Sequence, residues 1–147
     1  MIDVVERVDV VAPAAVVWAA VTDWHNQGAW MLGTRVRVVG GDGRSVGSRL
    51  WARTGVGPLG FTDRMEITRW EPPVACEVAH VGGLVRGTGG FRVEARGVSR
   101  STLVWWERLT PPFGVAGNLA WKVTGPAFRL GVRHSLRRFA DFAEARA

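Results

Sequence analysis

The last part of the sequence, Val115 to Ala147, is its longest stretch with the pattern of a helix. Within Phe128 to Glu144, apolar side chains recur at intervals of four and three residues, which is the spacing of one helix face. The pair Gly125–Pro126 interrupts the stretch, because proline lacks a backbone donor and crowds the preceding turn. We therefore predict one kinked helix, or a short helix followed by a long one. An amphipathic helix of this length must bury its apolar face, and a sheet is the partner that the rest of the chain can offer.

Most of the sequence before this helix has the composition and alternation of β-strands, separated by turns rich in glycine, aspartate and proline. The short connections favour antiparallel pairing of successive strands. After the first strand, Ala12–Pro13 opens one short helix, and Trp24–Met31 forms a second helical piece or an irregular turn. The pattern predicts an α+β fold in which an antiparallel sheet of about seven strands curves around the C-terminal helix. The expected strands span residues 2–11, 34–39, 47–53, 61–70, 74–80, 84–94 and 101–109.

The composition favours one cytoplasmic domain over residues 1–147. The single cysteine allows no internal disulfide, and the first residues lack the basic and apolar regions of a signal peptide. No apolar run approaches the roughly 20 residues that span a bilayer, so no transmembrane segment is expected. The net charge of +6 comes almost entirely from arginines that are dispersed along the chain. They form no recognised nucleic-acid-binding motif, so no specific nucleic-acid partner is expected. The sequence is compatible with a monomer or a homodimer.

Four short segments, in this order and spacing, carry a resemblance to a known superfamily: Ala12–Trp18, Trp70–Pro73, Gly87–Val93 and Ser101–Trp105. With the order of predicted elements, they resemble the helix-grip fold of the START-like or SRPBCC superfamily, which includes polyketide cyclase/dehydrase-like and birch-pollen-allergen-like proteins. The resemblance covers nearly the whole chain. It implies an apolar cavity between the sheet and the long helix. Members bind lipids, sterols, polyketides and other hydrophobic molecules, and a minority catalyse reactions on them.

Alternation along the strands predicts which side chains face such a cavity, because successive residues of a strand point to opposite faces. The apolar positions alternate with charged side chains such as Glu66, Glu77 and Arg92. We therefore expect the apolar face to look inward. The predicted ligand-binding residues are Met65, Ile67, Val78, Phe91, Val93, Leu103 and Trp105.

The same alternation places three polar side chains on the inward face: Asp63, His80 and Glu107. A carboxylate in an apolar cavity has a raised pKa, which suits it to proton transfer. The structural alternative is that Asp63 or Glu107 pairs with an arginine, such as Arg86 or Arg133, near the cavity mouth, since buried charges are usually paired. Both interpretations are compatible with the sequence.

No metal site or cofactor is expected. The three histidines, His25, His80 and His134, lie far apart and lack the spacing of metal ligands. The glycine run from Gly82 to Gly90 lacks the strand-to-helix context of a phosphate-binding loop. Nothing marks Cys76 as a nucleophile, and we expect an inert core thiol.

Two functions follow from this interpretation. The first is a non-catalytic protein that binds or carries a hydrophobic, lipid- or polyketide-like small molecule. The second is an enzyme of the polyketide cyclase or dehydratase type that uses His80, Glu107 or Asp63 as acid and base. The absence of a clear catalytic constellation in the sequence favours the first.

Overall fold

A computed structural model describes every residue from Met1 to Ala147, and its main element is one antiparallel sheet of seven strands. The strand order is β1-β7-β6-β5-β4-β3-β2, so every neighbour except β1–β7 is also consecutive in the chain. This arrangement confirms the predicted fold class and the meander of short connections. The strands are β1 (Ile2–Val10), β2 (Thr34–Gly40), β3 (Arg49–Thr54), β4 (Phe61–Glu71), β5 (Ala75–Val81), β6 (Arg86–Ala95) and β7 (Ser101–Thr110).

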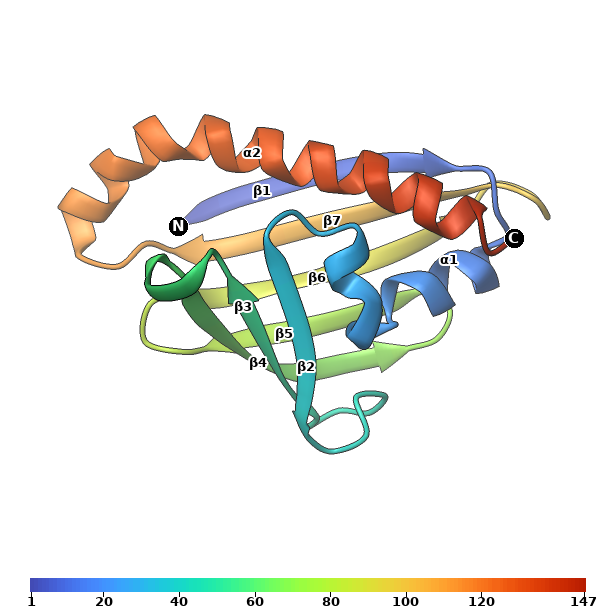
Figure 1. Cartoon of the computed structure of the whole chain (residues 1–147), viewed down its shortest axis with the longest axis horizontal. Helices are drawn as coiled ribbons and strands as arrows, with labels where there is room; N and C mark the ends of the chain where they lie inside the picture. Colours follow the sequence, from blue (N-terminus) through green and yellow to red (C-terminus); the bar gives the residue numbers. More distant parts are fainter.

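Two short helices connect the opposite edges of the sheet. Helix α1 (Ala14–Val21) follows Pro13, whose missing backbone donor is not needed at a helix start, and the 3-10 helix η1 (Trp24–Ala29) leads into β2. A second 3-10 helix, η2 (Gly57–Leu59), lies in the connection between β3 and β4. Figure 1 shows α1 and the C-terminal end of the last helix at one end of the molecule, and η2 with the start of that helix at the other.

The last helix, α2 (Gly114–Glu144), crosses the concave face of the sheet as one continuous element. Pro126 lies inside it, so the predicted alternative of two separate helices is wrong. One proline removes one backbone hydrogen bond and leaves the helical bonds on either side in place. Figure 1 shows the first turns of α2 set at an angle to the rest, as a kink requires. The residues of α2 that are buried all follow Thr124: Gly125, Val132, Ser135, Leu136, Phe139, Ala140 and Ala143.

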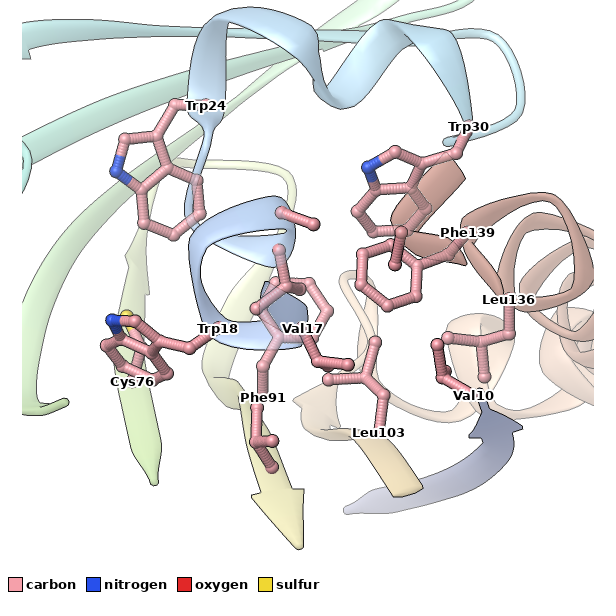
Figure 2. Close-up of a cluster of buried hydrophobic side chains, with 14 of the residues drawn as sticks. Val10, Val17, Trp18, Trp24, Trp30, Cys76, Phe91, Leu103, Leu136 and Phe139 are labelled. Atoms are coloured by element: carbon pink, nitrogen blue, oxygen red, sulfur yellow. The ribbon is translucent and has the colours of Figure 1, made fainter. Parts of the chain in front are cut away.

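The packed core occupies the end of the sheet that α1 covers (Figure 2). Trp30 is completely buried, and its ring lies against Phe139 of α2 with the ring centroids 4.9 Å apart. Edge contacts at 6.2 Å connect Trp30 to Phe91 and Trp105 of the sheet. Edge-to-face pairs of this kind are favourable beyond the area they bury. These contacts hold α2 to the sheet at the α1 end. They do not extend to the other end of the helix.

Candidate functional site: an apolar cavity with a charged cluster

A cavity of about 390 Å³ lies between the concave face of the sheet and α2. Sixteen of its 25 lining residues are hydrophobic, and no arginine or lysine is among them. Several lining side chains are also exposed to solvent, Leu32, Phe61 and Phe128 among them, so the cavity opens to the surface beside α2. A volume of this size falls within the range of small-molecule sites in proteins.

Four of the seven predicted lining residues, Met65, Val78, Phe91 and Trp105, line the cavity. For the other three the prediction is wrong: Ile67, Val93 and Leu103 lie in the packed core and do not line the cavity. Each of the three lies on the expected face, two residues further along its strand toward the α1 end. Alternation identifies the face of a strand, but it does not show how far along the strand the space is already filled.

The long helix lines the cavity as expected, although the sequence identified none of its lining residues individually. The contribution of β2, β3 and the η1 region to the lining was not predicted. The signal was present in β3, where Leu50, Ala52 and Thr54 alternate with Trp51 and Arg53. On α2, the lining residues follow helical spacing and include a glycine: Phe128, Gly131, Val132 and Ser135.

The three polar candidates, Asp63, His80 and Glu107, form one hydrogen-bonded cluster in the cavity wall. His80 Nδ1 lies 2.8 Å from Asp63 Oδ2, and His80 Nε2 lies 2.8 Å from Glu107 Oε2. The indole Nε1 of Trp105 donates to the other oxygen of Glu107, Oε1, at 2.9 Å. The expected pairing of these carboxylates with arginine is therefore wrong: both bind His80, and Arg133 instead bridges to Glu6 at 3.0 Å.

Glycines in β6 make this cluster possible. Glu107 is on β7 and His80 is on β5, so β6 separates them. Gly89 is the β6 residue paired with Glu107, and a Cβ at Gly89 would overlap the Glu107 carboxylate. Because Gly89 has no side chain, the carboxylate of Glu107 can extend across β6 to the imidazole. From the sequence, this glycine indicates only a weakened strand. The strand register is needed to show that it makes room for the carboxylate of Glu107.

The electrostatics of the cluster favour a protonated histidine. Burial alone would lower the pKa of His80, but the hydrogen bonds and charges of Asp63 and Glu107 outweigh it and raise the pKa to about 10. An imidazolium donates through both ring nitrogens, one to each carboxylate. The His80 side chain is 4 % exposed, and those of Asp63 and Glu107 are 14 % and 13 % exposed. One positive charge against two carboxylates leaves the cluster with one net negative charge.

The rest of the cavity offers little reactive chemistry. Burial raises the pKa of the Cys76 thiol to about 12, so at neutral pH it is protonated and a poor nucleophile. The structure contains no group of three or more acidic, histidine or cysteine side chains arranged to hold a metal ion. None of its helices combines the length and hydrophobicity that crossing a lipid bilayer requires.

Comparison with known proteins identifies the family. Residues 1–144 match the model of the family described as polyketide cyclase / dehydrase and lipid transport, and the chain belongs to this family. A sequence comparison with curated proteins finds no match. The START-like resemblance and the helix-grip fold inferred from the sequence are thereby confirmed.

Solved structures with this fold resemble the chain at low sequence identity. The protein TTHA0849 from Thermus thermophilus has a TM-score of 0.83 at 14% identity, with 99% of each chain covered. The Zhui aromatase/cyclase from a Streptomyces species has a TM-score of 0.78 at 17% identity, covering 99% of this chain and 94% of its own. A START superfamily protein from Mycobacterium smegmatis has a TM-score of 0.77 at 14% identity, with 99% of each chain covered. At these identities the likeness shows the fold alone, and family and fold are consistent with hydrophobic-ligand binding or with a cyclase-like role.

Proposed function

We propose that this protein binds a hydrophobic small molecule, lipid- or polyketide-like, in the cavity between the sheet and α2. The observation that supports this most is an open cavity of about 390 Å³ with a mainly hydrophobic lining and one charged cluster in its wall. Burying a ligand's apolar surface there gains roughly 25 cal/mol per Å² removed from water, before the costs of association.

The polar end of the ligand should be a hydrogen-bond donor. The donors of the cluster, His80 Nδ1, His80 Nε2 and Trp105 Nε1, are already directed at carboxylate oxygens. What the cluster can still offer a ligand is acceptor capacity on Asp63 and Glu107, both of which line the cavity. The lining contains no arginine or lysine, and the protonated His80 is already paired with two carboxylates, so no free positive charge compensates a carboxylate ligand. A hydroxyl, phenol or amine therefore suits the site, and an anionic headgroup does not.

Fluorescence of N-phenyl-1-naphthylamine, an apolar probe with one N–H, tests both parts of the proposal. The probe should bind, and 1-decanol should displace it at least about tenfold more effectively than decanoate, because about 1.4 kcal/mol of charge repulsion is enough for that factor. Absence of probe binding contradicts the cavity function. Equal displacement by decanoate contradicts the assigned ligand polarity.

Gly131→Leu shows whether the probe occupies this cavity. A Cβ at Gly131 would meet only Leu32, at 3.9 Å, and Gly131 lines the cavity, so we expect a leucine there to occupy cavity space. Replacing a helical glycine also gains up to about 1 kcal/mol of helix propensity. The variant should stay as stable as the parent and bind the probe at least about tenfold more weakly. Ala127→Leu, on the exposed side of the same helix, is the matched control and should bind normally.

An acid–base enzyme of the cyclase or dehydratase type is the second candidate. The observation in its favour is the position of Glu107 in the cavity wall, backed by a histidine that carries a proton. Against it, both ring nitrogens of His80 already bind carboxylates, so neither is free to contact a substrate.

Native mass spectrometry of the purified protein would identify a co-purifying molecule. If the protein turns that molecule over, Glu107→Gln should slow turnover by about 10²–10⁴ with affinity intact; for a carrier, affinity stays within a few-fold and there is no turnover to lose.

A further inference from the structure

The first part of α2 projects beyond the sheet. From Gly114 to Thr124 no residue is buried, whereas seven residues are buried between Gly125 and Ala143. Figure 1 shows these first turns extending past the end of β7. A helical segment without a buried face is unstable by itself in water, because most helical stability in proteins comes from packing. A binding surface outside the chain would supply the missing packing.

A second apolar stripe lies on this projecting segment, on the side opposite the cavity. Val115, Leu119 and Val123 follow each other at intervals of four residues and are 77%, 57% and 80% exposed. Leu119 and Val123 each lie two positions from Trp121, which places them about 200° around the helix from the face that continues into the cavity. Phe113, just before the helix, is 81% exposed, and Leu130 extends the stripe at 62%. Nothing in the chain covers these side chains.

The charged side chains of α2 itself are all basic before Asp141. No aspartate or glutamate occurs between Glu107 and Asp141. The only lysine of the chain, Lys122, lies beside the stripe. Arg129 follows two turns later on the same side of the helix, where its Nη2 donates to the carbonyl oxygen of Asp3 on β1 at 3.0 Å. An exposed apolar stripe flanked by basic side chains is the pattern of a helix that lies in the surface of an anionic membrane. Two copies of this segment would bring like charges together, which disfavours self-association through it.

The cavity opens at the same end. Phe128 of α2 and Phe61 of β4 line the cavity, and each is more than a third exposed. The neighbouring connection between β3 and β4 carries Val56 and Leu59, which are 83% and 90% exposed. Figure 1 shows this connection and the start of α2 at one end of the molecule. The cavity opening and these exposed apolar side chains therefore lie at the same end of the molecule.

We propose that residues 113–130 dock on an anionic lipid bilayer, which brings the end of the molecule with the cavity opening to the membrane surface. A hydrophobic molecule could then pass between bilayer and cavity with little exposure to water. The docking depends on the projecting segment and not on what the cavity binds, so it can fail while the proposed ligand binding stands.

Flotation with lipid vesicles tests the docking. The parent protein should float with phosphatidylglycerol vesicles and remain unbound with phosphatidylcholine vesicles. Val123→Asp should reduce flotation at least about tenfold, since it replaces a membrane-facing apolar group by a like charge. Lys122→Glu should reduce it too. Val98→Asp is the matched control: Val98 is 92% exposed in the turn between β6 and β7, at the other end of the strands, and the change should have no effect.

Three outcomes would overturn the proposal. The first is that the parent does not float with phosphatidylglycerol vesicles. The exposed stripe would then be better explained as a binding surface for a protein. The second is an equal loss in Val98→Asp and Val123→Asp. The third is a dimer that Val123→Asp converts to a monomer on size exclusion with vesicle binding unchanged, which would make the stripe a self-association surface. In all variants the N-phenyl-1-naphthylamine signal should match the parent's, because the substituted residues lie outside the cavity lining.

Discussion

The two ends of the space between the sheet and α2 differ, although the same strand faces line both. Toward α1 the space is filled by Trp30, Phe139 and Leu103, each completely buried. Toward the start of α2 it is hollow, and Phe128 there is 36% exposed. Both ends are apolar, so hydrophobicity does not separate a core from a cavity. Side-chain volume and the cover that α1 and η1 provide separate them.

A missing side chain contributes to the hollow at Gly131, which lines the cavity from α2 and whose Cβ would meet only Leu32, at 3.9 Å. At Gly89 of β6, by contrast, the Glu107 carboxylate occupies the space that a side chain would take. The only charges in the cavity wall are at this end, as part of the Asp63–His80–Glu107 cluster. The contrast suggests that the filled end supplies the stability of the fold and the hollow end supplies its chemistry.

Truncating one phenylalanine of α2 at each end should show the largest difference between the filled and the hollow end. Phe139→Ala should lower the free energy of unfolding by about 3–5 kcal/mol, because it opens a void in a packed core. Phe128→Ala should cost about 1 kcal/mol, since its side chain borders an existing cavity and solvent. Urea unfolding of the two variants measures both values. Equal costs would show that the hollow end contributes to stability as much as the core.

The second prediction concerns pH and the hollow end. The pKa of His80 is raised from 6.5 in the unfolded chain to about 10 in the fold. Its stabilising contribution is therefore complete below the unfolded pKa and is lost as pH rises toward the folded pKa. Between about pH 7 and about pH 9, the free energy of unfolding should fall by up to about 1.4 kcal/mol per pH unit from this group.

Urea unfolding across that range, in the parent and in His80→Gln, isolates the effect. The variant should lose the slope, whatever its absolute stability. His134→Gln, at an exposed histidine on α2, should keep it. The raised pKa of Cys76 contributes only above its ordinary value of 9.0 and is common to all three proteins. A parent with no slope would mean that His80 is not held protonated between its carboxylates.

The sequence was sufficient for the fold because it depends on repeated local patterns. Each pattern extends over many residues, both the alternation along the strands and the helical spacing that includes Val132 and Phe139. A single exception such as Pro126 therefore does not change the prediction. The alternation also put Asp63, His80 and Glu107 on one face, but it could not show that they bond to one another. That depends on strand register, which brings residues 63, 80 and 107 together across three strands. The sequence also could not show where along a strand the cavity ends and the packed core begins. For this reason Ile67 was predicted to line the cavity, although it lies in the core.

The last prediction has the smallest effect on stability and tests the cluster most directly. In Gly89→Ala the new methyl group would overlap the Glu107 carboxylate, which is the flexible end of its side chain and can move away. At neutral pH the free energy of unfolding should fall by about 1.4 kcal/mol for each unit by which the pKa of His80 falls, and replacing a strand glycine by alanine offsets part of this loss. The hydrogen bond from His80 to Glu107 should be lost, and with it part of the cause that raises the pKa of His80. An NMR titration of the imidazole, with His25 and His134 as internal references, should show a pKa below the parent's. Gly83→Ala, where a Cβ would meet nothing within 4 Å, should leave the His80 titration unchanged. An unchanged pKa in Gly89→Ala would mean that Asp63 alone holds the proton on His80, and that the glycines of β6 serve the curvature of the sheet rather than the charged cluster.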